Sequence, residues 1–572
     1  MTRLFNDPSE FADEMIDGFV LANSVQVRRV TGGVVRNTRT PEGTVAVVIG
    51  GGSGHYPAFG GIVGQGLAHG AAMGNLFASP SAQQVHSVAK AAERGGGVLL
   101  SYGNYAGDVL HFNQAQERLN SEGIETRTVT VTDDVSSAPL AEKHKRRGIA
   151  GDLTVFKAAA AAAEAGYSLD EVVRVAELAN ERTRSFGVAF SGCTLPGASA
   201  PLFSVPEGRM AIGMGIHGEP GIAETDVPTA DELAELFVST LLAELPEGVP
   251  TAEGARVGLI LNGLGTVKYE ELFVVYRRVA QLLDAAGVTI VDPEVGELVT
   301  SFDMAGTSLT LFWLDEELEG FWRAPADTPA YRKGSVDPAD LLDPAEIEEV
   351  AVEAIPEATA ESQQAAAVAY SVIEAIAEVI EENVEELGRI DAVAGDGDHG
   401  IGMQRGVSAA QAAAGDALAA GAGVQTLLER AGDAWADRAG GTSGALWGSA
   451  LRAVAAVLGD SSKPGAAEVA AGVQAAKDAI LTFGAVVGDK TMVDSLVPFA
   501  DTLSSEVDGG SGLAKAWARA AEVSATAAEQ TADLLPKMGR ARPHAEKSLG
   551  TPDAGAHSLA LIVQRITAVL EK

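Results

Sequence analysis

The sequence predicts an α/β domain followed by an all-helical domain, and three observations support this division. In the first half, short runs rich in β-branched residues alternate with helical stretches, which is typical of α/β folds. Residues 337–361 then carry nine acidic residues, three prolines and no lysine or arginine, a composition typical of a linker. After them, apolar residues recur at helical spacing and β-branched runs become scarce. We therefore expect an α/β domain over 1–335, an acidic linker over 336–362 and a helical bundle or barrel over 363–572.

The α/β domain is expected to contain two subdomains. Its strands are predicted at residues 44–50, 97–102, 126–132, 186–190, 256–262 and 288–292. In the helical domain, apolar residues between Val372 and Leu387 recur every three or four positions, and Gly388 follows as an expected C-terminal cap. A bundle buries such amphipathic helices most simply.

Composition limits the classes of partner. The chain has 572 residues and a formal net charge of −37, which argues against binding to nucleic acid or to an anionic membrane, because either needs a basic face. The only cysteine is Cys193, so no intrachain disulfide is expected. The N-terminus lacks an apolar signal core, and no uncharged apolar run approaches the ~18 residues of a membrane span. We expect a soluble, cytoplasmic protein.

The run V-A-G-D-G-D-H-G at residues 393–400 places Asp396 and Asp398 one residue apart, with Asp391 shortly before them. Carboxylates at that spacing repel unless a cation lies between them. The calcium-loop pattern fails, because Ile401 and Val407 occupy two of its required positions. Mg²⁺ fits better, since it takes one or two carboxylates and completes its coordination with water and phosphate oxygens. The alternative is a solvated Asp-Gly turn.

Further glycine-rich junctions occur in the helical half. The run G-G-T-S-G at 440–444 leads directly into a helical stretch, so Thr442, Ser443 and unpaired backbone N–H groups suit a phosphate. An ordinary N-cap is the alternative. G-D-K-T-M-V-D at 488–494 and the segment 538–556 again combine glycine, aspartate and a cation. The P-loop pattern is absent, so a nucleotide site here must be metal-centred.

In the first half, the strand at 44–50 runs into G-G-S-G-H-Y-P. A glycine loop at the carboxyl end of a strand is a common ligand crevice in α/β sheets, although the dinucleotide fingerprint fails because His55 replaces its last glycine. His55, Asp108 and His217 all follow apolar runs and are flanked by glycines. They are candidate proton-transfer or binding groups; the alternative is a structural role.

These motifs, in this order over essentially the whole chain, resemble those of single-chain dihydroxyacetone kinases. G-G-G-S-G-H-Y-P, N-Y-A-G-D and G-I-H-G-E-P-G resemble the substrate domain of that family, and G-D-G-D-H-G, G-G-T-S-G, G-D-K-T-M and R…P-D-A-G-A resemble its nucleotide domain. In detail, G-H-Y-P-A-F and G-R-A-R-P-H are most similar to the family's erythrulose kinases. The resemblance implies ATP-dependent phosphorylation of a terminal hydroxyl of a small ketose, erythrulose in the D or L form being the leading hypothesis.

The resemblance also implies roles for individual residues. His217 matches the histidine that forms a covalent hemiaminal with the substrate ketone, while Asp108 and His55 match residues that bind the ketose hydroxyls and handle the proton of the accepting one. Gly52, Ser53 and Gly54 match the loop that closes over the substrate. Two Mg²⁺ ions on the ATP phosphates are expected at Asp391, Asp396 and Asp398. The expected nucleotide contacts are His399, Thr442, Ser443, Met492, Arg540, Asp553 and Gly555.

Some residues depart from the usual family pattern. Tyr56 and Phe59 make the expected mouth of the substrate site more apolar, and Gly103 replaces a common lysine, which predicts room for an extra hydroxymethyl group. The alternatives are a dihydroxyacetone kinase, with or without FAD cyclisation, and a catalytically silent ketose sensor. Fusion of both domains disfavours a phosphotransferase-system partner, and the resemblance implies a homodimer.

Overall fold

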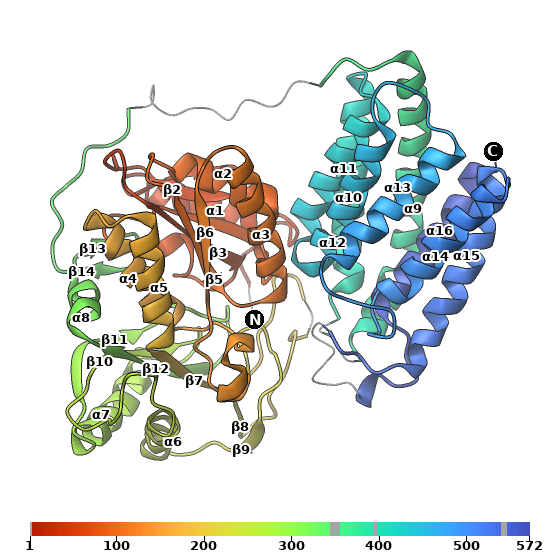
Figure 1. Ribbon diagram of the computed structural model, residues 1–572. Coiled ribbons are helices and arrows are strands. Elements are labelled where there is room, and N and C mark those ends of the chain that lie inside the picture. Colours follow the sequence, from red (N-terminus) through yellow and green to blue (C-terminus); the bar gives the residue numbers. More distant parts are fainter. Residues whose placement is uncertain are drawn as a thin grey trace. The chain divides into compact units, whose positions relative to one another are not determined.

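The structure is a computed structural model that describes residues 3–198, 200–343, 355–393, 395, 397–538 and 546–571. It divides into two compact units, Met1–Glu348 and Glu349–Lys572, which are treated separately below (Figure 1). The first unit contains two six-stranded sheets with helices, and the described part of the second contains helices. The predicted fold class, α/β followed by all-α, is confirmed.

The first sheet positions the candidate residues of the α/β unit. Its strands are β1 (Val27–Val30), β2 (Gly33–Arg36), β3 (Ala46–Ser53), β4 (Gly70–Leu76), β5 (Val98–Gly103) and β6 (Thr126–Val131), in the order β1-β2-β4-β3-β5-β6. β4, β3, β5 and β6 run parallel to one another, whereas β1 and β2 are antiparallel to their neighbours. Their carboxyl ends therefore meet at one edge of the sheet, where ligands bind in open α/β sheets.

The second sheet is mostly antiparallel. Its strands are β7 (Thr183–Ala189), β8 (Arg209–Ile212), β9 (Ala223–Asp226), β10 (Arg256–Gly263), β11 (Thr289–Gly296) and β12 (Gly306–Leu314), in the order β11-β10-β12-β7-β8-β9. β10 pairs with β11 in parallel, and the other neighbours are antiparallel. A short ribbon of β13 (Ala326–Asp327) and β14 (Arg332–Lys333) stands apart from both sheets. The two sheets correspond to the two predicted subdomains.

One hydrophobic cluster contains residues of both sheets of the first unit. Its helices are α1 (Phe11–Ala22), α2 (Ala82–Ala92), α3 (Ala106–Ser121), α4 (Asp152–Glu164), α5 (Leu169–Glu181), α6 (Ala230–Leu242), α7 (Tyr269–Ala285) and α8 (Glu316–Arg323). Every residue of α4 up to Ala163 is buried, and its alanines share the core with Val47 of β3 and Phe312 of β12. The small alanine side chains allow this helix to pack tightly on all sides.

The helices of the second unit form a closed ring. They are α9 (Ala360–Asp391), α10 (His399–Ala419), α11 (Val424–Ala439), α12 (Gly441–Leu458), α13 (Ala466–Leu481), α14 (Val493–Asp508), α15 (Leu513–Gln530) and α16 (Ala554–Leu570). Each packs against the next, and α16 packs against α9. The short connections from α9 to α12 make those neighbours antiparallel, so the N-termini of α10 and α12 lie at the end of the ring where α9 finishes. The starts of α14 and α16 lie there too, because Ser558 contacts His399 and Gly555 approaches Met492.

The expected cap at Gly388 is wrong, because α9 continues to Asp391. The carbonyl of Gly388 accepts a hydrogen bond from Ala392 N–H at 2.9 Å, which extends the helix. A Cβ at position 388 would lie 3.1 Å from the carbonyl oxygen of Gly397, and a Cβ on Gly400 would clash with the carbonyl of Val384. These glycines therefore allow the start of α10 to approach α9 closely, rather than ending the helix.

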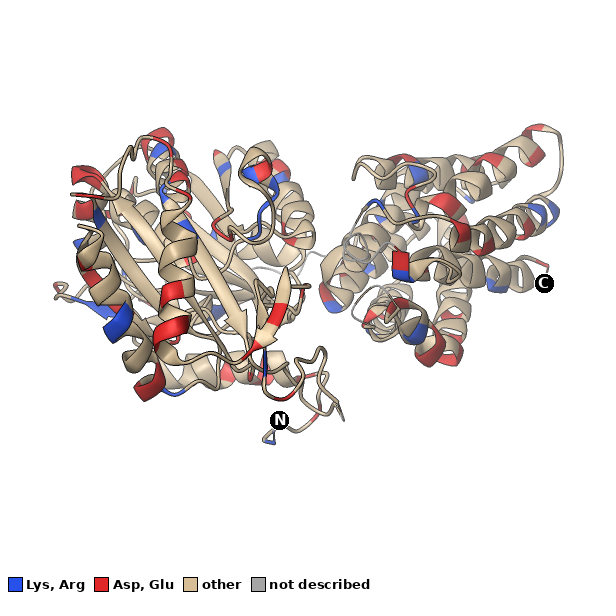
Figure 2. Ribbon diagram, turned by 90° about the horizontal axis from the view of Figure 1, so that it is seen from below, with Lys and Arg blue, Asp and Glu red and all other residues tan. Residues whose placement is uncertain are grey.

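Charge is distributed over the surface of both units. Figure 2 shows acidic positions on helices and loops of each unit, with basic positions interspersed among them. None of the helices in the described ranges combines the length and apolar composition needed to cross a bilayer.

Candidate functional site

Two histidines from different sheets meet in the α/β unit. His55 follows β3 of the first sheet, and His217 lies between β8 and β9 of the second. Their Nε2 atoms are 3.0 Å apart, and their rings are nearly perpendicular, with centroids 4.9 Å apart. The structure therefore brings together two residues separated by 162 positions, a convergence that periodicity could not show.

The outer nitrogen of each ring faces an acceptor. His55 Nδ1 lies 2.7 Å from the carbonyl oxygen of Thr300, and His217 Nδ1 lies 3.1 Å from Glu219 Oε1. Since a carbonyl only accepts and a carboxylate accepts when ionised, both Nδ1 atoms carry protons. The hydrogen bond between the two Nε2 atoms then requires one additional proton.

His55 is only 2 % exposed. Burial, reinforced by the nearby His217, lowers the pKa of His55 to about 3. The His217 ring differs from that of His55, because it faces a carboxylate, Glu219.

Glu219 holds His217 by two contacts and is itself held by an arginine. Besides the Nδ1 contact, Glu219 Oε2 accepts the main-chain N–H of His217 at 3.0 Å. Arg147 lies 3.7 Å from Glu219 and 2.8 Å from Asp134. Burial alone would raise the pKa of Glu219, but His217 and Arg147 hold it below its ordinary value. The carboxylate therefore stays ionised and can stabilise a positive charge on His217.

Aromatic rings enclose the histidine pair. The rings of Tyr105 and Phe77 stand perpendicular to His217 at centroid distances of 4.6 and 5.5 Å, and Phe77 also lies 5.1 Å from His55. Such walls exclude water and strengthen electrostatic interactions inside the site.

The other predicted substrate residues lie at the same sheet edge. Asp108 is in the first turn of α3, directly after β5, and is 7 % exposed. Gly52 and Ser53, expected in a loop that closes over the substrate, form the end of β3, and Ser53 Oγ donates to the carbonyl of Gly74 at 2.6 Å. Gly54 has φ +104°, a left-handed conformation that glycine adopts without strain and that turns the chain toward His55.

The residues that depart from the family pattern have different environments. Tyr56 is half exposed, whereas Phe59 is 6 % exposed and belongs to the hydrophobic core. Of the two residues expected to make the mouth of the substrate site apolar, only Tyr56 is therefore at the surface. The position beside Gly103 is bordered by a carboxyl group, an aromatic ring and a main-chain carbonyl. A Cβ there would lie 3.3 Å from Asp152 Oδ2, 3.2 Å from the Tyr105 ring and 3.3 Å from the carbonyl of Gly148. Glycine at this position therefore keeps a side chain from crowding the Asp152 carboxyl group.

In the helical unit, predicted residues gather where helices begin. His399 opens α10, and its Nε2 lies 3.0 Å from Ser558 Oγ of α16. Asp553 caps α16 by accepting the N–H of Ala556 at 2.7 Å. A Cβ on Gly555 would lie 3.3 Å from Met492, the residue before α14. This end of the ring thus carries several helix N-termini, which suit phosphate groups.

Carboxyl groups also gather at this end. Burial, with the charge of Asp391 close by, raises the pKa of Asp398 to about 6. Burial, together with the charges of Asp494 and Asp391, raises the pKa of Asp553 to about 7. Carboxylates in such proximity are stabilised by a cation, and a set of oxygen donors fits Mg²⁺.

Part of the predicted nucleotide site lies outside the described residues. Asp396 and Arg540 do, so their roles stay predictions. Within the described ranges, no group of three His, Cys, Asp or Glu residues is arranged to hold a metal. The predicted metal site of Asp391, Asp396 and Asp398 is not tested by this search, because Asp396 lies outside those ranges. Thr442 and Ser443 lie in the first turn of α12, after Gly440 and Gly441 with φ of 61° and 55°.

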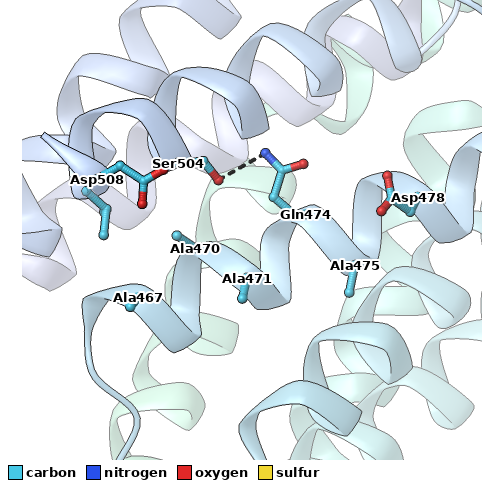
Figure 3. Close-up of a pocket in the computed structure, with 9 residues that line it drawn as sticks. Ala467, Ala470, Ala471, Gln474, Ala475, Asp478, Ser504 and Asp508 are labelled. Atoms are coloured by element: carbon cyan, nitrogen blue, oxygen red, sulfur yellow. Dashed lines mark hydrogen bonds between the residues drawn. The ribbon is translucent and has the colours of Figure 1, made fainter.

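A separate surface pocket lies between α13 and α14 (Figure 3). Four alanines line it, and Gln474 donates to Ser504 Oγ across it at 3.0 Å. None of its nine lining residues is among those predicted for the site.

Sequence reasoning did not select Tyr105, Arg147, Asp152 or Glu219. Glu219 had a usable signal, since it lies two residues after His217 in the same glycine-rich motif. Tyr105 likewise lies inside the N-Y-A-G-D run. Arg147 lies near Glu219, and Asp152 lies beside Gly103, through tertiary packing alone.

Comparisons with known proteins agree with both halves of the chain. The family described as Dak1 domain matches residues 17–330, and the family described as DAK2 domain matches residues 393–568. An L-erythrulose kinase of Pectobacterium atrosepticum is 65% identical over 572 residues, covering 100% of this chain and 97% of the relative. A D-erythrulose kinase of Mycolicibacterium smegmatis is 55% identical, covering 99% and 98%.

A solved structure covers the same extent. The dihydroxyacetone kinase of C. freundii in complex with AMP-PNP and Mg²⁺ aligns with a TM-score of 0.53 and 29% identity, covering 99% of each chain. Both units of the present chain therefore have counterparts in that single polypeptide.

Proposed function

Because this chain belongs to the dihydroxyacetone kinase family, we propose that it transfers the γ-phosphoryl group of ATP to a terminal hydroxyl of erythrulose. Relatives named as L- and D-erythrulose kinases share 65% and 55% identity with it over nearly its full length. The observation that carries the proposal is the histidine pair backed by Glu219, since it offers a nucleophile and a proton donor to a ketone.

The ketose half of the reaction would begin at His217. Its proton moves to His55 Nε2, which frees the His217 Nε2 lone pair to attack the carbonyl carbon. An N–C bond forms, the C=O π bond breaks, and the oxygen takes the proton from His55. The product is a hemiaminal on a cationic imidazole that faces the Glu219 carboxylate, so charge and protons balance. Only a carbonyl compound can react in this way, which selects ketoses over simple polyols.

The phosphoryl-accepting step would use Asp108 as the base for the terminal hydroxyl, within hydrogen-bond reach of that oxygen. On the nucleotide side, bound Mg²⁺ supplies neutralisation of the phosphate charge during in-line transfer. We propose that Asp391, Asp396 and Asp398 hold two such ions, and that His399, Thr442, Ser443, Met492, Arg540, Asp553 and Gly555 contact the nucleotide. The N-termini of α10, α12 and α16 would receive phosphate oxygens.

Further features of the proposal rest on the family resemblance. We propose a homodimer in the cytoplasm, with ATP rather than a phosphocarrier protein as the phosphate source. Light scattering coupled to size-exclusion chromatography tests the dimer. Dihydroxyacetone is the second candidate substrate, because the C. freundii relative is named for it.

The proposed function is tested by product analysis. Phosphorus NMR of the full chain with Mg²⁺–ATP and erythrulose should show ADP and a ketose monophosphate, and the phosphorylated carbon identifies the acceptor hydroxyl. Binding of Mg²⁺–ATP and ketose without turnover would instead support the sensor hypothesis. Product formation from dihydroxyacetone but not from erythrulose would replace the proposed substrate.

A further inference from the structure

A buried carboxyl group follows a third strand of the first sheet and lies near the proposed ketose site. β3, β5 and β6 are adjacent and parallel. His55 follows β3 and Asp108 follows β5. α4 follows β6, after the 3₁₀ turn Leu140–Lys145. Asp152 is the first residue of α4 and is 2 % exposed. It therefore lies in the layer of residues that forms the binding edge of the sheet.

The Asp152 carboxyl group packs against bare backbone. A Cβ on Gly103 would lie 3.3 Å from Oδ2, and a Cβ on Gly148 would lie 2.6 Å from Oδ1. Glycine at both positions leaves space for the carboxyl group at the carboxyl end of β5. Side chains at these positions would displace it.

One of the two carboxyl oxygens of Asp152 is buried without a hydrogen bond: within the described part of the chain, Oδ1 has no partner. Asp133 is a second buried carboxyl group and lies in the connection between β6 and α4. Its oxygens differ, because they accept the N–H groups of Ile149 and Gly151, each at 2.9 Å. Asp133 thus secures the start of α4. An unsatisfied buried carboxyl oxygen is costly and needs a reason, of which a ligand is one.

Tyr105 lies between the surroundings of Asp152 and the histidine pair. Tyr105 packs its ring edge at the Gly103 position, donates its hydroxyl to the carbonyl of Gly148 at 2.9 Å, and presents its ring to His217. Burial, followed by the charges of Asp133 and Asp108, raises the pKa of Asp152 well above its ordinary value. The group is thus close enough to Asp108 to interact electrostatically, and its protonated form both donates and accepts hydrogen bonds.

We propose that Asp152 is a substrate-specificity residue whose carboxyl group hydrogen-bonds the hydroxyl of a four-carbon ketose that a three-carbon ketose lacks. The inference rests on the proposed function and deepens it. With His217 on the ketone carbon and Asp108 at the accepting hydroxyl, the added hydroxymethylene group extends toward the position beside Gly103. A polar partner there, rather than empty volume, distinguishes erythrulose from dihydroxyacetone.

The test compares the two ketoses in Asp152 variants of the full chain. Asp152→Ala should lower kcat/KM for erythrulose by about 10- to 100-fold and for dihydroxyacetone by less than about 3-fold. Asp152→Asn keeps a donor and an acceptor and should restore most of the erythrulose activity. Equal losses for both ketoses, or none for either, would overturn the proposal.

Asp133→Asn is the matched control, because it alters a buried carboxyl group of the same connection whose oxygens accept main-chain N–H groups at the start of α4. It should lower the thermal unfolding midpoint while leaving the ratio of the two kcat/KM values unchanged. A changed ratio in this variant would show that distortion of α4, not contact with substrate, sets the preference.

Calorimetric titration of erythrulose without ATP separates this inference from the proposed function. If the wild type binds erythrulose but does not phosphorylate it, the kinase proposal fails, and a selective loss of erythrulose affinity in Asp152→Ala still supports the specificity role. If the wild type neither binds nor phosphorylates erythrulose, both proposals are overturned.

Discussion

The Nε2 atoms of His55 and His217 lie 3.0 Å apart while the Nδ1 atom of each ring faces an acceptor. The hydrogen bond between the two rings needs one proton beyond those on the Nδ1 atoms. In the proposed reaction, that proton would pass to the ketone oxygen and His217 Nε2 would be the attacking nitrogen. The pair depends on contacts from both sheets, so the site exists only when the two sheets pack together.

His217→Ala should remove the covalent adduct and lower kcat/KM for ketoses by at least about 100-fold. The reason is that, in the proposed reaction, His217 supplies the nitrogen that bonds to the carbonyl carbon. Carbon NMR with ketose labelled at the carbonyl carbon follows the adduct directly, because the signal moves from the carbonyl to the tetrahedral region. A wild-type enzyme whose labelled ketose never shows the tetrahedral signal, despite turnover, would refute the hemiaminal.

Glu219→Gln should lower kcat for erythrulose by about 10- to 100-fold, because a charged hydrogen bond to the cationic His217 ring is replaced by a neutral one. The amide retains the size of the carboxylate, so binding of Mg²⁺–ATP should be unaffected. Steady-state kinetics with a parallel nucleotide titration measures both quantities. If kcat stays at the wild-type value, Glu219 does not stabilise the positive charge.

The buried neutral His55 should make the α/β unit sensitive to acid. Above pH ~6.5 the imidazole is neutral in the folded and unfolded states, but as the pH falls from there toward 3, the unfolded chain binds a proton that the folded chain excludes. Stability is therefore lost on acidification, by about 2 kcal/mol at a pH of about 5.

Scanning calorimetry of the wild type and of His55→Gln at two pH values measures this loss. The transition that the substitution affects should shift less between about pH 7 and pH 5 in the variant than in the wild type. Equal shifts would show that His55 titrates near its ordinary pKa in the folded protein.

Asp391→Asn and Asp398→Asn should each weaken Mg²⁺–ATP binding by at least about tenfold, because each removes a negative oxygen donor from the proposed metal site. Binding of erythrulose should not change, since the ketose residues lie in the other unit. Calorimetric titration of each ligand, repeated after chelation of the metal, checks both statements. Wild-type nucleotide affinity in both variants would remove these aspartates from the metal site.

The fold could be predicted where local patterns decide it. The six predicted strands correspond to β3, β5, β6, β7, β10 and β11, because each is a short run of apolar or β-branched residues. β12 was overlooked, although G-T-S-L-T-L-F-W-L at 306–314 carries the same signal. The end of α9 could not be predicted from Gly388, since the reason for that glycine is a tertiary contact with Gly397.

For the candidate site, the sequence could indicate which residues to consider but not which of them lie together. His55, Asp108 and His217 could be selected because each follows an apolar run and is flanked by glycines, but which of them meet depends on how the sheets pack. Asp152 gave no signal at all, because it lies in an ordinary helix start next to an alanine tract. Its unsatisfied oxygen becomes visible only in three dimensions.

The central claim is tested most directly by kcat/KM measured with Mg²⁺–ATP for L-erythrulose, D-erythrulose and dihydroxyacetone under identical conditions. The account predicts that one erythrulose enantiomer exceeds dihydroxyacetone by at least about tenfold, the difference that one well-placed hydrogen bond supplies. A clear preference for dihydroxyacetone, or ADP release that does not depend on any ketose, would contradict it.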